Sequence, residues 1–151
     1  MSEKLNRNQI TKLIPHRDPF LFLDELVEIK KLETATGVYT FKNTEDFFLG
    51  HFPGHPIVPG VILVEMMAQA GAALIAYSID EETADKVVYL MNIEKTKFRN
   101  PVFPNQTIYT NVKALRSKCR VWKLQGKTFD SENKIIIEAI WCSMIMDRHY
   151  V

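Results

Sequence analysis

A histidine and a glutamate, His51 and Glu65, stand near the two ends of a segment that is otherwise almost entirely apolar. These are two of the side-chain types that take and give protons in enzyme active sites. The segment, residues 50–65, reads GHFPGHPIVPGVILVE. A carboxylate on an apolar segment is costly to bury and requires an explanation. On residue type alone, His51 is better explained as a loop histidine that binds a backbone group, so the flanking sequence has to decide.

The prolines of this segment determine how His51 is held. Pro53, Pro56 and Pro59 each fix the φ angle and lack a backbone N–H. The residue before a proline is also pushed away from the helical region. Residues 51–59 are therefore expected to form a stiff, extended loop rather than a helix or a central strand.

His51 and His55 have the i, i+4 spacing of a metal-binding pair. That spacing brings two histidines together only on a helix, which Pro53 prevents. The two cysteines, Cys119 and Cys142, match no spacing typical of a metal or redox site, and we expect both to be reduced side chains in strands. The sequence thus predicts neither a metal site nor a cofactor.

The element that carries Glu65 is predicted to be a long helix. Gly60 precedes Val61 to Ile79, a run rich in Ala, Met and Leu that contains no proline. The groups that would stay polar on its buried face are Glu65 and Gln69, whose i, i+4 spacing places them on the same side of the helix. A helix that is apolar all round is typical of a buried core helix.

A membrane-spanning helix is the alternative for this part of the chain. Residues 57–79 are long enough to cross a bilayer. They lack the flanking basic and aromatic anchors of a transmembrane helix, however, and the rest of the chain is strand-forming. We therefore predict no membrane insertion.

The overall composition is that of a globular domain of ordinary charge. Of the 151 residues, 46% are hydrophobic and 25% are charged, which suits one domain, residues 1–151, with a sizeable core. The formal net charge of +1 argues against binding to nucleic acid. Residues 1–12 are polar and lack the apolar region of a signal peptide, so we expect a cytoplasmic location.

Six segments have the β-branched and aromatic content of strands. Residues 21–31 and 34–42 are expected to form a hairpin around a polar turn near Leu32 and Glu33. The other four segments follow the helix and are residues 87–99, 107–117, 120–129 and 134–146. One long apolar helix and about six strands predict an α+β fold in which an antiparallel sheet wraps around the helix.

Three groups of residues form a recognisable pattern. The first is His51-Phe52-Pro53-Gly54-x-Pro56, followed by Pro59-Gly60-Val61, by Glu65 and by Met67-Ala68-Gln69. The others are Leu13-Ile14-Pro15-His16-Arg17 with Pro19-Phe20-Leu21 and Asp24, and Lys97-Phe98 with Pro101-Val102 and Pro104. Together they resemble the signature of the (3R)-3-hydroxyacyl-[acyl-carrier-protein] dehydratases of fatty-acid synthesis. The resemblance covers most of the chain and implies the hotdog fold, a curved antiparallel sheet around a central helix.

The resemblance implies roles for three groups. Dehydration of a 3-hydroxyacyl thioester needs a base for the proton next to the carbonyl, an acid for the leaving hydroxyl and a donor for the thioester oxygen. By resemblance, His51 is the base and Glu65 is the acid. The backbone N–H of Gly60, at the positive end of the helix, polarises the thioester carbonyl.

The resemblance also implies a homodimer, or a trimer of such dimers, in which the base and the acid of one site come from different subunits. The acyl chain would then lie in a tunnel at the dimer interface. The residues expected to contact the substrate are Phe52, Val61, Ile62, Met66, Met67, Gln69 and Tyr89, the last of which resembles a gating tyrosine of some relatives. Gln69 is expected mainly to support Glu65 by a hydrogen bond, and His16 to order its own loop.

Two sets of basic residues alternate along predicted strands, namely Lys95, Lys97 and Arg99, and Arg116, Lys118 and Arg120. Alternation places each set on one face, which is commonly no more than a solvated face. With the family resemblance, Lys95, Lys97 and Arg99 are expected to dock an acidic acyl carrier protein that brings the substrate.

Two other functions stay open on sequence grounds. A hotdog thioesterase would use a carboxylate and water on a similar acyl thioester, but hydrolysis does not need a proline-framed His51 opposite Glu65. A non-catalytic acyl-binding protein would not need both side chains. Departures from the family pattern at Glu25, His55 and Asn105-Gln106 bear on which acyl substrate is used.

Overall fold

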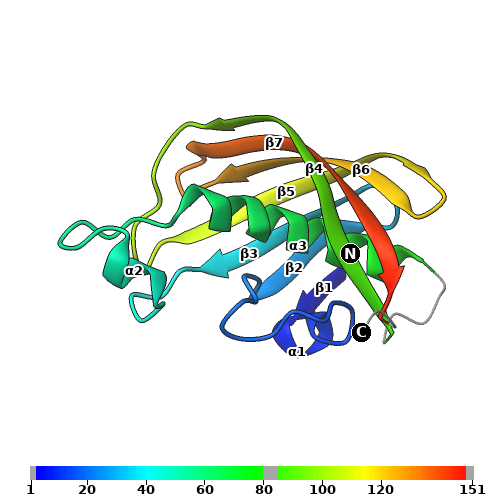
Figure 1. Ribbon diagram of the computed structural model, residues 1–151, viewed down its shortest axis with the longest axis horizontal. Helices are drawn as coiled ribbons and strands as arrows, with labels where there is room; N and C mark the ends of the chain where they lie inside the picture. The colour runs from blue at the N-terminus through cyan, green and yellow to red at the C-terminus, as the bar shows by residue number, and fades with distance from the viewer. Residues whose placement is uncertain (1–2, 80–84, 149–151) are drawn as a thin grey trace.

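A computed structural model describes residues 3–79 and 85–148 of the chain (Figure 1). In this part of the chain the strands are β1 (Glu3–Asn6), β2 (Glu25–Lys30), β3 (Thr34–Thr40), β4 (Lys86–Phe98), β5 (Thr107–Lys118), β6 (Val121–Phe129) and β7 (Ile135–Asp147). The helices are α1 (Arg7–Ile10), α2 (Phe47–Gly50) and α3 (Gly60–Ser78). The strands form one antiparallel sheet in the order β1-β2-β3-β5-β6-β7-β4.

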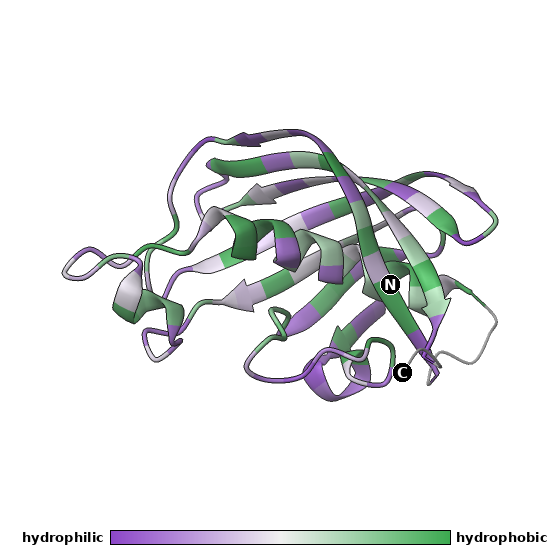
Figure 2. Ribbon diagram, viewed as in Figure 1, coloured by the Kyte–Doolittle hydropathy of each residue, from purple (hydrophilic) through white to green (hydrophobic). Residues whose placement is uncertain are grey.

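The sheet curves around α3, which lies at the centre of the core (Figure 1). Figure 2 shows that α3 is built mainly of apolar residues, and most of them between Leu63 and Ala76 are buried. By length and composition alone α3 could cross a membrane, but 67% of that stretch is buried inside the protein. The predicted core helix is therefore confirmed, and with it the α+β hotdog arrangement.

Close contact between α3 and the sheet depends on the absence of a side chain at Gly126. A Cβ atom at this position would lie 2.3 Å from Met67 Cε and 2.9 Å from the ring of Trp141. Both neighbours are almost completely buried. Because protein cores are packed about as densely as organic crystals, neither side chain has free space to move into. Glycine on β6 thus sets how closely the sheet approaches α3.

The structure corrects the predicted strands at the N-terminal end. The sheet has seven strands rather than about six, because the short segment β1 pairs with β2. The first hairpin strand begins at Glu25 and not at residue 21. Two backbone groups of residues 22 and 23 are taken by side chains instead of a strand, since Phe22 N–H donates to Gln69 and the Leu23 oxygen accepts from Arg7.

The structure also corrects the prediction for one cysteine. Cys142 lies in β7 as expected, but Cys119 lies in the turn between β5 and β6, where its φ angle is 57°. Both thiols are free, and that of Cys119 is exposed.

β4 forms one edge of the sheet, where β7 is its neighbour within the described strands. It is 13 residues long and crosses α3 in Figure 1. Large apolar side chains are exposed along it, namely Tyr89, Leu90, Met91 and Ile93. A long, exposed, apolar edge strand is a ready surface for pairing with another chain.

Candidate active site

His51 directly follows α2, and its imidazole is oriented by the loop that comes after it. Nδ1 of His51 is 3.0 Å from the backbone oxygen of Ile57, and the Ile57 N–H donates to the His51 backbone oxygen. A carbonyl oxygen can only accept, so Nδ1 carries the hydrogen and Nε2 carries the lone pair. The ring also stacks on Phe52, with 4.0 Å between the ring centroids. In the neutral form of the His51 ring, Nε2 is therefore the nitrogen that can take a proton.

The predicted loop over residues 51–59 is present, but it is not extended throughout. Phe52 and His55 are joined by two backbone hydrogen bonds of 2.9 and 2.8 Å. These close a turn in which Gly54 has a φ angle of 75°, a conformation that glycine adopts without strain. The turn shortens the loop and returns the chain to Ile57, the partner of His51.

Glu65 lies near the start of α3, with 22% of its side chain exposed. Gln69 Nε2 donates to Glu65 Oε1 at 3.0 Å, which is the hydrogen bond predicted from their spacing. The Gln69 amide is itself held in place. Its oxygen accepts the Phe22 N–H at 2.8 Å, and its nitrogen also donates to the Phe20 backbone oxygen at 3.0 Å. Gln69 is buried and acts as a support for Glu65.

His16 is a residue of this site that the sequence reasoning placed elsewhere. It was expected to order its own loop, whereas its Nε2 lies 3.5 Å from Glu65 Oε1. Burial lowers the pKa of His16, Glu65 raises it, and Arg17 lowers it further. Its presence in the motif Leu13 to Arg17 was the available signal, but the contact itself depends on how the loop folds back onto α3.

The N-terminus of α3 offers a backbone donor. No side chain caps this helix, and the Gly60 N–H makes no hydrogen bond within the residues that the structure describes. The ring of Phe98 lies over Gly60, where an added Cβ would be 2.7 Å from Phe98 Cε1. An unpaired N–H at the positive end of a helix can stabilise a developing oxyanion.

The other predicted substrate contacts fall into two groups. Phe52, Val61 and Tyr89 are exposed, with 48%, 74% and 51% of their surface accessible. Met66 and Met67 have no accessible surface and belong to the core of the chain. The expectation that these two methionines line a tunnel at the dimer interface stays a prediction.

His51 and Glu65 have separate neighbours within one chain. His51 contacts Ile57 and Phe52, whereas Glu65 contacts Gln69 and His16. Among the described residues, no hydrogen bond or ion pair joins the two. A single chain therefore holds a candidate base and a candidate acid without bringing them into direct contact.

Two small cavities continue from Glu65 along α3. The first, of about 60 Å³, has Glu65 and His16 at one end, and the second, of about 10 Å³, reaches Ile79. Ala72 on α3 and Val88 on β4 line both cavities. The two cavities therefore lie next to each other between α3 and β4, and we refer to them together as the path between α3 and β4. Sequence reasoning did not single out Ala72 or Val88.

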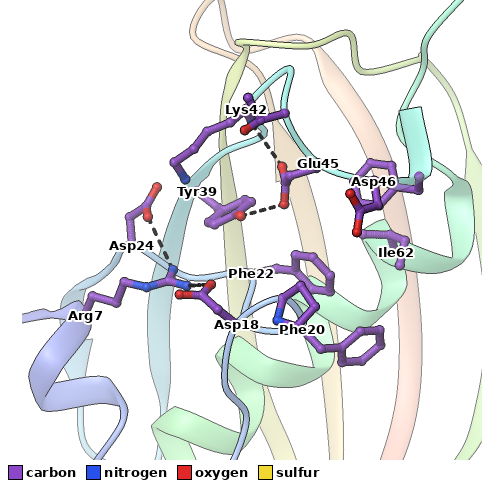
Figure 3. Close-up of a pocket in the computed structure, with 13 residues that line it drawn as sticks. Arg7, Asp18, Phe20, Phe22, Asp24, Tyr39, Lys42, Glu45, Asp46 and Ile62 are labelled. Carbon is purple, nitrogen blue, oxygen red and sulfur yellow. Dashed lines mark hydrogen bonds and ion pairs between the residues drawn. The ribbon is translucent and has the colours of Figure 1, made fainter. Parts of the chain in front are cut away.

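Residues 3–24, which comprise β1, α1 and the loop before β2, are called the N-terminal arm. A much larger cavity, of about 690 Å³, lies between this arm, β3 and the loop before α2 (Figure 3). Ile62 lines this cavity, together with Phe20 and Phe22, and its place in a tunnel at the dimer interface stays a prediction. Neither His51 nor Glu65 takes part in it.

Several of the polar and charged groups around this large cavity are paired with one another. Arg7 binds both Asp18 and Asp24, and the Tyr39 hydroxyl donates to Glu45 at 2.7 Å (Figure 3). Burial raises the pKa of Tyr39 and also that of Glu45. Because these polar groups already satisfy one another, we interpret the cavity wall as the structure that fastens the N-terminal arm to the sheet.

Lys95, Lys97 and Arg99 line one groove formed with β6 and β7. Their strict alternation is interrupted by a bulge between Glu94 and Lys97, where Lys95 has a φ angle of 41°. Arg99 Nε donates to Glu138 Oε2 at 2.6 Å, and this hydrogen bond lowers the pKa of Glu138. Arg99 is thus partly neutralised.

The second basic set is less regular than predicted. Arg116 and Lys118 lie at the end of β5, whereas Arg120 lies beyond the turn at Cys119. Arg120 also pairs with Asp147 at 3.6 Å. The alternation on one strand therefore ends at Lys118.

The fold defines the class of protein. A solved dehydratase heterocomplex from Xenorhabdus doucetiae has a TM-score of 0.76 at 12% identity, over 92% of this chain and 91% of that one. A hot-dog-like protein from Thermanaerovibrio acidaminovorans has a TM-score of 0.62 at 11% identity, over 79% of this chain and 84% of that one. At such low identities the likeness shows the fold alone, and that fold is the hotdog fold.

The sequence narrows this class to a family. Residues 14–140 match the FabA-like domain. The 3-hydroxyacyl-[acyl-carrier-protein] dehydratase FabZ of Campylobacter fetus subsp. fetus is 44% identical over 147 residues, which cover 93% of this chain and 97% of that protein. The FabZ of Acidiphilium cryptum is 42% identical over 139 residues, which cover 92% of this chain and 84% of that protein. The chain belongs to the FabZ family of dehydratases.

Proposed function

We propose that this protein removes water from (3R)-3-hydroxyacyl thioesters of acyl carrier protein and forms trans-2-enoyl thioesters for fatty-acid synthesis. The observation that supports this best is the pair of prepared groups in a chain of the FabZ family: an imidazole with its Nε2 lone pair free and a carboxyl group fixed by Gln69. The imidazole of His51 can accept a proton and the carboxyl group of Glu65 can give one, and dehydration needs these two proton transfers.

In the proposed reaction, His51 Nε2 takes a proton from C2 of the substrate. The electron pair of that C–H bond forms the C2=C3 double bond while the C3–O bond breaks. Glu65 gives its proton to the departing hydroxyl, which leaves as water. The Gly60 N–H stabilises the thioester oxygen, where negative charge develops. Exchange with water then removes the proton from His51 and returns one to Glu65.

We infer that each site is shared between two protomers. Within one chain His51 and Glu65 have separate neighbours, which supports a site in which the base of one copy meets the acid of another. β4 offers the surface for that copy, since it is an edge strand with exposed Tyr89 and Ile93. A two-fold symmetric pairing would place two equivalent sites in one dimer. A trimer of such dimers remains compatible with this arrangement.

We assign the acyl chain to the path between α3 and β4 and the carrier protein to the basic groove of β4. The path starts at Glu65 and passes Ala72 and Val88. Lys95 and Lys97 form no ion pair among the described residues and supply positive charge for an acidic carrier protein.

The experiment that tests the proposal follows water loss and addition on 3-hydroxyacyl and enoyl carrier-protein thioesters. His51→Ala and Glu65→Gln should each lower turnover by at least about 100-fold, because general acid and base catalysis contribute that much. His55→Ala is the matched control, since His55 is exposed in the same loop. Near-normal dehydration by either site variant would refute the roles, and release of free carrier-protein thiol would identify a thioesterase instead.

Mixing the two inactive variants tests the shared site. A mixed dimer contains one site with both wild-type side chains, so part of the activity should return. If activity stays absent after subunit exchange has been demonstrated, each site is built within one chain.

A further inference from the structure

His16 stands next to Glu65 in the cavity that begins the acyl path, and the reaction proposed above gives it no role. We propose that His16 is a positioning residue for the acid: its Nε2–H donates to Glu65 Oε1 and leaves the Glu65 proton on Oε2, facing the substrate. The inference rests on the proposed function, because it assigns a partner to the acid of that reaction.

The tautomer of His16 follows from what surrounds the two ring nitrogens. Nδ1 is buried and has no hydrogen-bond partner among the described residues. Nε2 faces the carboxyl oxygen of Glu65. A buried N–H without an acceptor is rarer and more costly than an unused lone pair. The hydrogen therefore belongs on Nε2, where an acceptor is in front of it.

The distance of 3.5 Å between His16 Nε2 and Glu65 Oε1 is longer than an ordinary hydrogen bond. Contacts between catalytic groups are often long in the substrate-free protein and shorten when the substrate binds. Here the carboxyl has room to move, because a cavity of about 60 Å³ lies between it and β4. Filling that cavity with an acyl chain would confine Glu65 toward His16 and Gln69.

The two oxygens of Glu65 are not equivalent. Oε1 already accepts from Gln69 at 3.0 Å, and the orientation of that amide is fixed by the backbone of Phe20 and Phe22. A second donor from His16 on the same oxygen makes Oε1 the carbonyl-like atom of the protonated acid. Glu65 Oε2 has no partner among the described residues, so it is the atom that can give its proton to the leaving hydroxyl.

The charge of His16 matters for this role. A cationic imidazole beside Glu65 would hold it as a carboxylate, and a carboxylate has no proton to give. Burial favours the neutral ring, and Arg17 in the same loop acts in the same direction, while Glu65 on α3 opposes both. A neutral N–H donor can instead bind the acid before transfer and stabilise the carboxylate after it.

Two substitutions separate a donor role from a packing role. His16→Gln keeps an N–H at nearly the position of Nε2, whereas His16→Leu fills the space without a donor. We expect His16→Leu to lower kcat by about 10- to 100-fold with little change in KM, as the loss of a hydrogen bond to a charged group implies. His16→Gln should recover most of that loss.

The pH profile gives a readout that packing alone would not move. The acid must be protonated, so activity falls as the pH rises through the pKa of the acid. Loss of a donor to the carboxylate raises that pKa, so the descending limb of His16→Leu should shift to higher pH while that of His16→Gln stays in place. An unshifted limb in a folded His16→Leu variant overturns the proposal.

The double variant distinguishes this inference from the assignment of Glu65. In a Glu65→Gln background, His16→Leu should cause no further loss, because His16 acts through Glu65. An active Glu65→Gln would defeat the proposed function itself. An inactive Glu65→Gln with a fully active His16→Leu would defeat only the role of His16.

A measurement on the unaltered protein covers the case in which His16→Leu does not fold. Nitrogen NMR of protein labelled in its histidines reports which ring nitrogen carries the hydrogen. His16 should be neutral and protonated on Nε2 at pH 7. A ring protonated on Nδ1 or on both nitrogens would refute the proposal.

Discussion

Replacing Gln69 by leucine should weaken the fold and the acid together. Gln69 is 1% exposed and joins three groups: the Phe22 N–H, the Phe20 carbonyl and the Glu65 carboxyl. Leucine has a similar volume and makes none of these bonds. Gln69→Leu therefore leaves the buried Phe22 N–H and the part-buried Phe20 carbonyl without their partner and frees the Glu65 side chain.

The size of the effect follows from those two backbone groups. An unsatisfied buried donor costs about 1–3 kcal/mol and a part-buried acceptor somewhat less, so the free energy of unfolding should fall by about 2–5 kcal/mol. For a domain of this size, 1 kcal/mol corresponds to about 2–4 °C in melting temperature. The midpoint should therefore drop by about 5–15 °C, and dehydration should slow even at temperatures where the variant stays folded.

Urea unfolding and thermal melting measure this directly. Gln106→Leu is the matched control, because Gln106 accepts one hydrogen bond, from the Phe103 N–H at 2.7 Å, in an exposed loop. Its effect should stay near 0.5 kcal/mol, as is usual at the surface. If Gln69→Leu is no less stable than Gln106→Leu, the buried amide does not hold residues 20–22 against α3, and the reasoning fails.

Two further changes test the surfaces around the site. Lys97→Glu should raise the KM for carrier-protein substrates but not for a short thioester mimic. Added salt should reduce the difference, because rim charges steer docking over about 10 Å. Equal losses on both substrates, or an equal effect of Lys134→Glu at the exposed turn before β7, would contradict docking at this groove. Ala72→Val should lower the turnover of long acyl chains more than that of short ones, since it adds two methyl groups at a residue that lines both small cavities. An unchanged preference for chain length would place the acyl chain elsewhere.

The helix was predictable because its signal is local. Gly60–Ser78 differs by one residue at each end from the predicted Val61–Ile79, since a proline-free apolar run ends where the proline loop and a polar linker begin. The bond between Glu65 and Gln69 was predictable for the same reason, because α-helix geometry fixes which residues are neighbours.

The N-terminal arm was missed because its strand is short and polar. β1 reads EKLN and has no apolar alternation, so only its pairing with β2 makes it a strand. A signal for α1 was present, since Asn6 and Gln9 form a capping box whose spacing can be read from the sequence.

The contact between His16 and Glu65 joins residues far apart in the chain, and it exists because the loop between α1 and β2 folds back onto α3. Neither secondary-structure propensity nor residue spacing in the sequence predicts that this loop folds back onto α3. The bulge at Lys95 is a similar case, since its left-handed backbone breaks an alternation that the sequence alone would extend. Local rules therefore predicted the elements and the candidate pair, and tertiary packing supplied the groups that hold the pair.

His51 and Gln69, the support of Glu65, are oriented by main-chain atoms, which has a consequence for how the protein tolerates mutation. His51 is oriented by the carbonyl of Ile57, and Gln69 by the backbone of Phe20 and Phe22. No ordinary substitution at these three positions removes a backbone oxygen, and of the standard residues only proline removes the N–H that Phe22 donates. The side chains at these loop positions can therefore change while the imidazole tautomer and the direction of the Gln69 amide persist.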